Sequence, residues 1–511
     1  MQVHRLLTGF LLTLGTVVPL GACSSSDSYV IVTVAAQPAV HDAKSLTVTL
    51  TNAGTTRMDS LVLRDRVFPV TFSISTPGRS GDLVIAVDAT DENGLVVGHG
   101  TATTTVAVPD ASIRLDSTDF VVNTDYASDQ FPNTFSEASG FQLAAQPDGT
   151  WTAAFADACV SRSCNLFGRR FDKTGKPVQT QVAAGTNVFN LTTIPTDIFS
   201  TPAIASSAST TLAVWNYTSV DGLTTGIACR ALDAAGRATA NQTIIPPDSA
   251  DVVAVAALST GNFVASWNSF AANPGVVRTS IIKPDCTALT PTPLTVSANV
   301  LGTYVKTSSV ASSGDQALFV WTLGGDLHIR LASPSGTFTI PDSVLVPKTS
   351  TEEVFHARVA AATSGGFVIA ARWAQSSLTG PGRIELFRVN TAGKLVGAPT
   401  LVTDKSASDF DNRQSFGIAS RPDGTIMIAW HTCSDLGDGS KCGVFGRILR
   451  DTGEPVTDVF SVPTTTEGDQ QLPSVVGLPD AFVAMWADGS EKAPDVSGQA
   501  VRARIIYLPG M

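Results

Sequence analysis

The sequence predicts an all-β protein in which a small β-sandwich precedes a seven-bladed β-propeller of four-stranded blades. Short alternating runs rich in Val, Ile and Thr recur along the chain, separated by turn-forming Gly (42 residues) and Pro (28 residues). All seven Trp residues lie after residue 150, one in each of seven similar segments. The length of 511 residues also exceeds what one ordinary core supports, so we expect two domains.

The first segment, residues 1–22, is expected to be a lipoprotein signal peptide. Arg5 precedes the apolar run from Leu6 to Leu20, which has the length of a signal segment and is short for a membrane span. The run ends in Leu20-Gly21-Ala22-Cys23, which resembles the bacterial lipobox. The resemblance implies that Cys23 carries the lipid anchor, including palmitate. Ordinary secretion with a chance cysteine is the alternative.

The lipobox resemblance also implies a location. Residues 23–28 would form a Ser-rich tether, and Ser24 after the acylated cysteine is typical of lipoproteins sent to the outer membrane. We therefore expect a lipid-anchored protein of the cell envelope, at the outer membrane, facing either the periplasm or the cell surface.

Residues 29–116 are predicted to form the small sandwich, either immunoglobulin-like or transthyretin-like. About seven short strands alternate apolar and polar residues, as in 29–34, 46–50 and 83–87. Asp88, Asp91, Glu92 and Asn93 leave a calcium loop open as an alternative, but a hairpin turn accounts for the same residues. No other cofactor or metal is expected.

Residues 117–511 are predicted to form the propeller, because one aromatic residue marks each repeat. Taking Phe155 as the first anchor, successive anchors are separated by 60, 52, 54, 52, 57 and 56 residues. Trp151 lies on the same strand face as Phe155 because the offset is even. The anchors are Trp151, Phe155, Trp215, Trp267, Trp321, Trp373, Trp430 and Trp486.

Each repeat has the parts of a propeller blade. A small-residue strand, a tight turn, the Trp strand, a variable loop, a third strand and an outer strand follow one another. The third strand carries an Arg six residues before a closing Gly, at Arg169, Arg230, Arg330, Arg447 and Arg504. An Arg repeated at one position favours a structural role. Its aliphatic carbons would pack between blades, and its guanidinium would donate hydrogen bonds to backbone carbonyls. The segment 117–123 resembles an outer strand and is expected to complete the last blade, which closes the ring.

No signature of a named propeller family recurs in these repeats. Kelch repeats require a paired Tyr and Trp, and the Asp-box of sialidases requires another order of turn residues. Over nearly its whole length the chain resembles bacterial outer-membrane-type lipoproteins with seven-bladed propeller repeats. That resemblance implies an architecture and a location, and it assigns no activity.

The remaining cysteines suit an oxidising compartment. Cys159 with Cys164, and Cys433 with Cys442, each bracket a short polar loop as disulfides do. Zinc is the competing interpretation, but the nearby ligands are too few. Cys229 and Cys286 pair only if neighbouring repeats bring them together, and the sequence leaves this open.

Long, varied loops at one end of the blades predict an acidic, aromatic-bearing binding face. A solvated loop face of an acidic protein is the alternative. The candidate residues are Asp125, Tyr126, Asp129, Phe131, Asp197, Phe199, Glu352, Glu353, Phe355, His356, Asp409, Phe410, Asp411, Glu467 and Asp469.

The function favoured by the sequence is a membrane-tethered, non-enzymatic binding module for a protein or a glycan. The net charge of −11 and the lack of a basic stripe argue against nucleic acid. No nucleophile elbow, phosphate loop or His-Glu-x-x-His motif is present, so no catalytic residue is assigned. A propeller glycoside hydrolase, or a structural or assembly scaffold of the envelope, remains the alternative. We expect a monomer.

Overall fold

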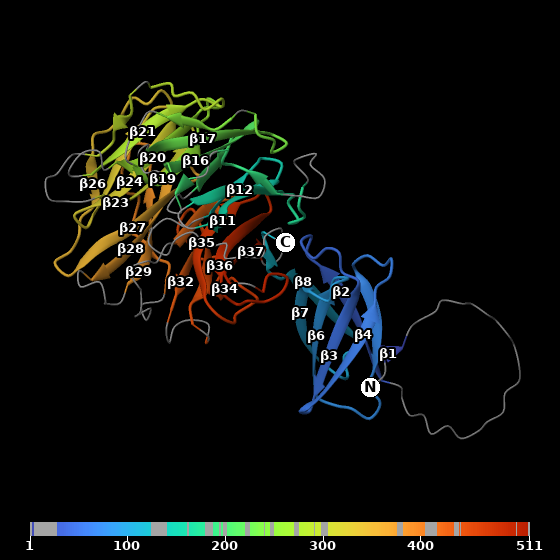
Figure 1. Cartoon of the computed structure of the whole chain (residues 1–511). Coiled ribbons are helices and arrows are strands. Elements are labelled where there is room, and N and C mark those ends of the chain that lie inside the picture. The colour runs from blue at the N-terminus through green and yellow to red at the C-terminus, as the bar shows by residue number, and fades with distance from the viewer. Residues whose placement is uncertain are drawn as a thin grey trace, which may run out of the picture. The chain divides into compact units, whose positions relative to one another are not determined.

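The computed structural model describes residues 3–4, 28–123, 141–160, 163–178, 188–193, 196–197, 202–219, 225–239, 241–245, 250–269, 275–290, 292–297, 305–375, 382–403, 416–433, 439, 441–496 and 498–508. Of these, residues 3–4, 141, 157–160, 163–164, 196–197, 251–252, 306–307 and 375 are described by backbone only. The chain divides into two compact units, Met1–Thr118 and Asp119–Met511. Within the described ranges every regular element is a strand (Figure 1). None of the described residues belongs to a helix long and apolar enough to span a membrane.

The first unit is one curled sheet. Its strands are β1 (Val3–His4), β2 (Tyr29–Ala36), β3 (Ser45–Asn52), β4 (Thr55–Val62), β5 (Val70–Ser75), β6 (Asp82–Thr90), β7 (Val96–Thr105) and β8 (Asp110–Ser117). They are hydrogen-bonded in the order β1-β5-β2-β8-β7-β6-β3-β4, and only β2 and β8 run parallel. Alternate residues are buried along β2, β3, β5, β6 and β8, and their side chains form one core.

The expected immunoglobulin-like or transthyretin-like sandwich is therefore replaced by a simpler arrangement. β8 pairs along its length with β2 and, at its end, with β7 through Gly98–Ser117 and His99–Asp116. These pairs join what would be two separate sheets into one half-barrel. The possible calcium loop is a hairpin turn in which Asp91 Oδ1 accepts the N–H groups of Asn93 and Leu95 at 2.8 Å each.

The second unit is the predicted seven-bladed propeller, shown from teal to red in Figure 1. The blades, each written from the inner to the outer strand, are: blade 1, β10 (Phe141–Ala145), β11 (Trp151–Val160), β12 (Ser163–Phe171), β13 (Val188–Asn190), with β14 (Thr196–Asp197) also beside β12; blade 2, β15 (Pro202–Ser206), β16 (Thr210–Thr218), β17 (Thr225–Asp233), β18 (Thr243–Ile245); blade 3, β19 (Ala250–Ala257), β20 (Phe263–Ser269), β21 (Val276–Ile282), β22 (Leu294–Thr295); blade 4, β23 (Val305–Ser313), β24 (Gln316–Leu323), β25 (Asp326–Ala332), β26 (Ser343–Val346); blade 5, β27 (Glu352–Ala361), β28 (Phe367–Gln375), β29 (Arg383–Val389), β30 (Thr400–Leu401); blade 6, β31 (Phe416–Ser420), β32 (Thr425–Thr432), β33 (Gly443–Arg450), β34 (Phe460–Ser461); and blade 7, β35 (Gln470–Gly477), β36 (Ala481–Asp488), β37 (Ala500–Tyr507), β9 (Phe120–Val121).

Ring closure follows the sequence prediction. β9, from the start of the second unit, is the outer strand of blade 7 and pairs with β37 through Val121–Arg502 and Phe120–Ala503. The inner strands of blades 1 and 7, β10 and β35, also lie against each other. Every blade therefore has a neighbour on both sides, and the closed ring leaves no blade face uncovered.

The aromatic anchors fill the spaces between blades. Trp151, Trp215, Trp267, Trp321 and Trp486 are fully buried, and Trp373 and Trp430 nearly so. In blade 1, Trp151 stacks on Phe171 with ring centroids 4.2 Å apart, while Phe155 occupies the repeat position. Large rings at one level of every blade bury much apolar area between neighbouring sheets.

The repeated arginines join blades 1, 2, 4, 6 and 7 to the outer strand of the blade before each of them. Arg330 Nη1 donates to the carbonyl oxygens of Thr295 at 3.1 Å and Val296 at 2.8 Å, and its guanidinium lies over the Phe338 ring. The same contact runs from Arg169 to Val122, from Arg230 to Asn190 and Leu191, from Arg447 to Leu401 and Val402, and from Arg504 to Val462. These contacts have the form expected from the sequence, with guanidinium forks on backbone carbonyls.

Blades 3 and 5 lack this arginine and are joined to their predecessors in other ways. Ser280 and Phe387 occupy the position. Phe387 packs into a core shared with blade 4, whereas Cys286 of blade 3 forms a disulfide with Cys229 of blade 2. The pairing of Cys229 with Cys286, which the sequence left open, is therefore present, and it joins blades 2 and 3 covalently.

Replacing Arg330 by Met is expected to lower the free energy of unfolding by about 2 kcal/mol, because charge-assisted bonds to two backbone carbonyls are lost. Urea denaturation followed by Trp fluorescence measures the change in the propeller alone, since every Trp lies there. Arg237→Met is the control, because Arg237 makes only an exposed ion pair with Asp233, and should change the value by at most about 0.5 kcal/mol. Equal effects of the two variants would contradict the role assigned to Arg330.

Candidate functional site

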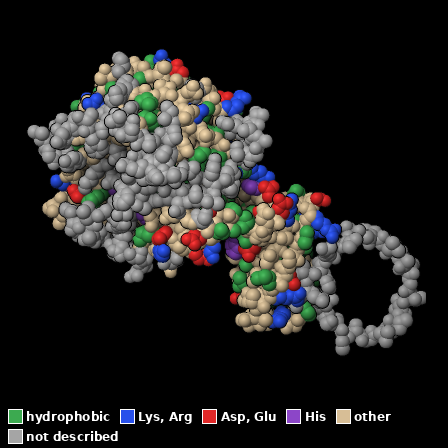
Figure 2. Space-filling model, viewed as in Figure 1, with side chains coloured by type: hydrophobic (Ala, Val, Ile, Leu, Met, Phe, Trp, Pro, Cys, Tyr) green, Lys and Arg blue, Asp and Glu red, His purple; other side chains and the backbone are tan. Residues whose placement is uncertain are grey.

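The connections between second and third strands and the connections between blades lie at one end of the propeller, which we call the loop face. On the visible side of the molecule, acidic and basic side chains are both present among polar and apolar ones (Figure 2). Of the predicted face residues, the structure describes Glu352, Glu353, Phe355, His356, Glu467 and Asp469. Outside the described residues lie Cys23, Asp125, Tyr126, Asp129, Phe131, Phe199, Asp409, Phe410 and Asp411, and the side chains of Asp197, Cys159 and Cys164.

An arginine between two carboxylates occupies the loop-face end of blade 5. Arg383, the first residue of β29, donates from Nη1 to Glu352 Oε1 at 2.5 Å and from Nε to Glu385 Oε1 at 2.9 Å. Its guanidinium also lies 5.2 Å from the ring centroid of Trp373. Burial disfavours the charge of Arg383, but the two carboxylates outweigh burial and raise its pKa. We call Glu352, Arg383, Glu385 and Trp373 the blade 5 cluster.

Two predicted face residues next to this cluster point into the protein. Phe355 is 5% exposed and His356 is 3% exposed. A β-bulge between Val354 and His356 in the pairing of β27 with β28 gives the chain one extra residue at this point. The structure therefore brings Glu352 and Glu353 to the partly exposed rim and buries the two ring-bearing side chains.

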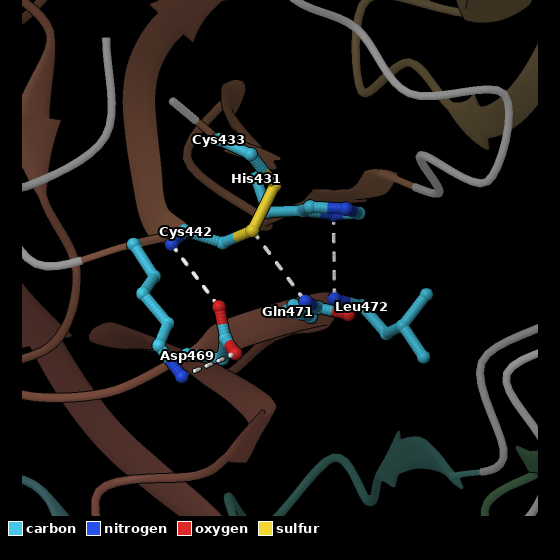
Figure 3. Close-up of a disulfide and its surroundings, with 7 residues drawn as sticks. His431, Cys433, Cys442, Asp469, Gln471 and Leu472 are labelled. Atoms are coloured by element: carbon cyan, nitrogen blue, oxygen red, sulfur yellow. Dashed lines mark hydrogen bonds and ion pairs between the residues drawn. A yellow bond between two sulfur atoms is a disulfide. The ribbon is translucent and has the colours of Figure 1, made fainter. Parts of the chain in front are cut away.

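A second set of side chains surrounds the predicted disulfide between Cys433 and Cys442, which the structure contains with Cα atoms 3.9 Å apart (Figure 3). Asp469 Oδ1 accepts the Cys442 N–H at 3.3 Å, and Asp469 Oδ2 lies 3.6 Å from Lys441 Nζ. The Gln471 amide donates to Cys442 Sγ at 3.4 Å. These contacts hold Lys441 and Cys442, just before β33, against the start of blade 7.

Beneath the disulfide, the buried His431 contacts the inner strand of the next blade (Figure 3). Its Nδ1 accepts the N–H of Leu472 at 3.3 Å. Leu472 has φ of 57°, in the left-handed region, at a β-bulge between Gln471 and Ser474. Bulges also interrupt β19, β23 and β27 near their first residues, so with β35 four of the seven inner strands have an irregular loop-face end.

The inner strands also surround a central channel of about 180 Å³. All seven blades contribute to its lining, and most of the lining side chains are small or apolar, as in Ala254, Val310 and Ile418. The polar side chains in the described lining are Gln142, Ser309, Ser474 and Arg358. Arg358 is the one charged residue among them.

Sequence reasoning missed Arg383, Glu385, Lys441 and Arg358. Arg358 directly precedes the small-residue run Val359-Ala360-Ala361, and an Arg at the centre of such an inner strand was the available signal. Arg383 and Glu385 are two residues apart on a strand, so they share a face, but nothing in the sequence aligned them with Glu352. Among the described residues, no group of three or more His, Cys, Asp or Glu side chains could hold a metal ion.

No protein-family model matches the sequence, and no curated protein matches it. Solved structures with a similar fold include a protein of unknown function from Dyadobacter fermentans (12% identity, 77% of this chain and 98% of that chain, TM-score 0.43). An ulvan lyase of polysaccharide lyase family PL25 is similar at 10% identity (76% and 94%, TM-score 0.44), and an α-L-arabinanase from Penicillium chrysogenum at 11% (66% and 99%, TM-score 0.38). Such similarity concerns the fold alone.

Proposed function

We propose that the chain is a membrane-tethered lipoprotein whose propeller is a non-enzymatic binding module for a protein or a glycan. The blade 5 cluster carries the proposal: two carboxylates, one guanidinium and an indole are held together at the loop face by the contacts given above. Preorganised charged and aromatic groups on a rigid scaffold favour binding, because little side-chain entropy is lost when a partner docks.

The glycosidase alternative receives less support from this cluster. Glycoside hydrolases need two carboxyl groups that face the substrate, one of them protonated. Glu352 and Glu385 instead both face the guanidinium of Arg383, at 2.5 and 2.9 Å. This arrangement suits recognition of polar groups. A structural or assembly role in the envelope is the other function that competes with a binding module.

The test compares partner binding of a form that begins at residue 28 with that of its Arg383→Ala variant, in a pull-down from outer-membrane extract and on a glycan array. We expect the variant to lose about tenfold or more in affinity for the partner found, because a charge-assisted pair is lost. Arg237→Ala is the matched control, since Arg237 pairs with Asp233 at the opposite end of blade 2 and should bind normally. Unchanged binding by Arg383→Ala would reject the blade 5 cluster as the site, and release of sugar from a bound glycan would favour the hydrolase.

The proposed anchor has its own test. Labelling of cells with a palmitate analogue is expected to mark the full chain, and Cys23→Ala should remove the label and release the protein from the membrane fraction. A chain that stays labelled and membrane-bound after this substitution would contradict an anchor at Cys23.

A further inference from the structure

The last strand of the curled sheet, β4, has a free edge. In the hydrogen-bonding order of the described strands, β4 follows β3 and has no neighbour on its other side. It is 8 residues long, whereas the outer strands of the propeller blades contain two to four residues. Its pairing with β3 has no register shift, and it contains neither Pro nor Lys. Short edges, bulges, Pro and Lys commonly prevent pairing with other chains, so this edge lacks those protections.

The hairpin between β3 and β4 determines which backbone groups of β4 point outward. The turn residues Ala53-Gly54 have φ of 49° and 75°, as in a two-residue type I′ turn. The flanking pair Asn52–Thr55 is then hydrogen-bonded, and hydrogen-bonded and non-hydrogen-bonded pairs alternate beyond it. The Leu63 N–H donates to the Lys44 carbonyl oxygen at 2.8 Å, as this alternation requires. The residues whose N–H and C=O groups point away from β3 are therefore Thr56, Met58, Ser60 and Val62.

Side chains along β4 alternate between the solvent face and the core face of the sheet. Met58 and Val62 lie on the solvent face and are 67% and 54% exposed. Arg57 and Asp59 lie on the other face, in line with the buried Leu61. Arg57 Nη2 donates to Asp59 Oδ1 at 2.8 Å, and both side chains remain partly exposed. The free edge thus carries one positive and one negative charge, two residues apart.

This charge pattern complements itself when a second copy of β4 lies antiparallel to the first. With Met58 of one copy opposite Met58 of the other, Arg57 of each copy faces Asp59 of the other copy. Registers centred on Arg57 or on Asp59 would place two like charges opposite each other. The Met58-centred register also brings the outward N–H and C=O groups together, which gives about six backbone hydrogen bonds. A lone charge on the core face would oppose such pairing, but here each charge meets its opposite.

We propose that β4 is an interaction surface for a second copy of this chain, and that antiparallel β4–β4 pairing centred on Met58 joins two curled sheets into one. The contact is two-fold symmetric, so it uses the free edge of both copies and closes as a dimer. Strand pairing buries less area than a standard interface, so the dimer dissociates on dilution. This dimer replaces the monomer expected from the sequence, and it does not depend on the function proposed for the propeller.

Sedimentation equilibrium of the full chain in density-matched detergent tests the proposal. The original chain is expected to show a reversible monomer–dimer equilibrium. Arg57→Asp alone and Asp59→Arg alone each turn both attractive pairs into repulsive ones, so each variant should dimerise about tenfold or more weakly. An equal mixture of the two variants should dimerise like the original chain, because opposite charges face each other again. The double variant, Arg57→Asp with Asp59→Arg, should do the same by itself.

Three outcomes of this experiment would overturn the proposal. One is dimerisation of both single variants as strong as that of the original chain, and another is a mixture that stays monomeric. The third is an original chain that stays monomeric at every concentration, whether or not its edge then binds an extended peptide from another protein.

A cysteine cross-link tests the register independently. Opposite Cα atoms in a hydrogen-bonded antiparallel pair are about 5.5 Å apart, within the range of a disulfide. Met58→Cys should therefore form a disulfide-linked dimer under mild oxidation. Val62→Cys is the matched control, because Val62 is exposed on the same edge but lies about 27 Å from its counterpart in this register. Cross-linking of Val62→Cys as fast as that of Met58→Cys would reject the register centred on Met58.

Discussion

Replacing Asp119 by Ala is expected to destabilise the propeller by about 3–5 kcal/mol, the largest loss that we predict for a single substitution. Arg502 Nη1 lies 3.2 Å from Asp119 Oδ1, and Arg502 Nε lies 2.7 Å from Asp488 Oδ2. The side chains of all three residues are at most 4% exposed. Removal of Asp119 leaves Asp488 as the remaining buried counter-charge of Arg502 and leaves Arg502 Nη1 without its carboxylate acceptor. A buried charged donor without an acceptor is costly.

Asp119 also connects the closing strand β9 to the chain that leads into blade 7. Its carboxylate accepts the N–H groups of Thr464 and Thr465, at 2.8 Å each, and both of their hydroxyls. The Ala variant loses these bonds together with the ion pair, so β9 is held to blade 7 mainly by its short pairing with β37. We expect blade 7 to open before the rest of the ring.

Urea denaturation followed by Trp fluorescence measures the effect on the propeller, because the first unit contains no Trp. Asp458→Ala is the control, since Asp458 belongs to the propeller and is exposed, and it should change the free energy of unfolding by at most about 0.5 kcal/mol. Asp119→Asn should fall between Asp119→Ala and the original chain, because the amide keeps one acceptor oxygen. A loss below about 1 kcal/mol in Asp119→Ala would contradict a buried ion pair at the closure.

Removing the Cys229–Cys286 disulfide is expected to have the second largest effect. The bond encloses 57 residues, for which loop-closure entropy of the unfolded chain corresponds to about 4 kcal/mol. It also lies at the joint where Ser280 occupies the position of the repeated arginine, so blade 3 has no counterpart of the contact that Arg330 makes in blade 4. Reduction under native conditions should be slow, because Cys229 is 0% and Cys286 1% exposed.

The choice of replacement at Cys286 sharpens this test. Cys286 has φ of 67°, at the turn position where Gly175, Gly236, Gly336, Gly393 and Gly453 stand in other blades. Gly adopts such a backbone without the strain that a Cβ causes. Cys229→Ala combined with Cys286→Gly should therefore lose less stability than Cys229→Ala combined with Cys286→Ala, by about 1 kcal/mol.

Denaturation of both double variants, with and without a reductant, gives the comparison. Cys433→Ala combined with Cys442→Ala removes a bond that spans only 9 residues, and it should cost less, about 2–3 kcal/mol. Equal stability of the two Cys286 replacements would show that the left-handed backbone is not maintained once the disulfide is gone.

The propeller was predictable from the sequence because its signal repeats. Aromatic anchors recur at one place in all seven blades and turn glycines in most of them, so each repeat supports the same interpretation. The arrangement of the first unit lacked such a signal. Alternation along β2 or β3 indicates which face is buried, but it contains no information on the parallel pairing of β2 with β8.

The candidate sites and the disulfide between blades 2 and 3 were harder to predict. Glu352 was placed in a loop by its polarity, whereas it begins β27 and meets Arg383 from a separate strand. The disulfide of Cys286 required knowing that the third strand of one blade faces the closing turn of the next. Arg358 was missed because a residue lines the central channel only through the arrangement of all seven blades. The periodicity within one strand contains no information on that arrangement.

The order of the interblade contacts has a consequence for how the chain is made. Arg230, Arg330, Arg447 and Arg504 each bind the outer strand of the blade that precedes them. Each newly synthesised blade thus secures the one that emerged before it, and assembly can advance in step with synthesis or export. The final closure differs, because Asp119 must wait for Arg502, 383 residues later. Until then the earliest part of the propeller has no partner, and its outer strand edge is exposed to other chains.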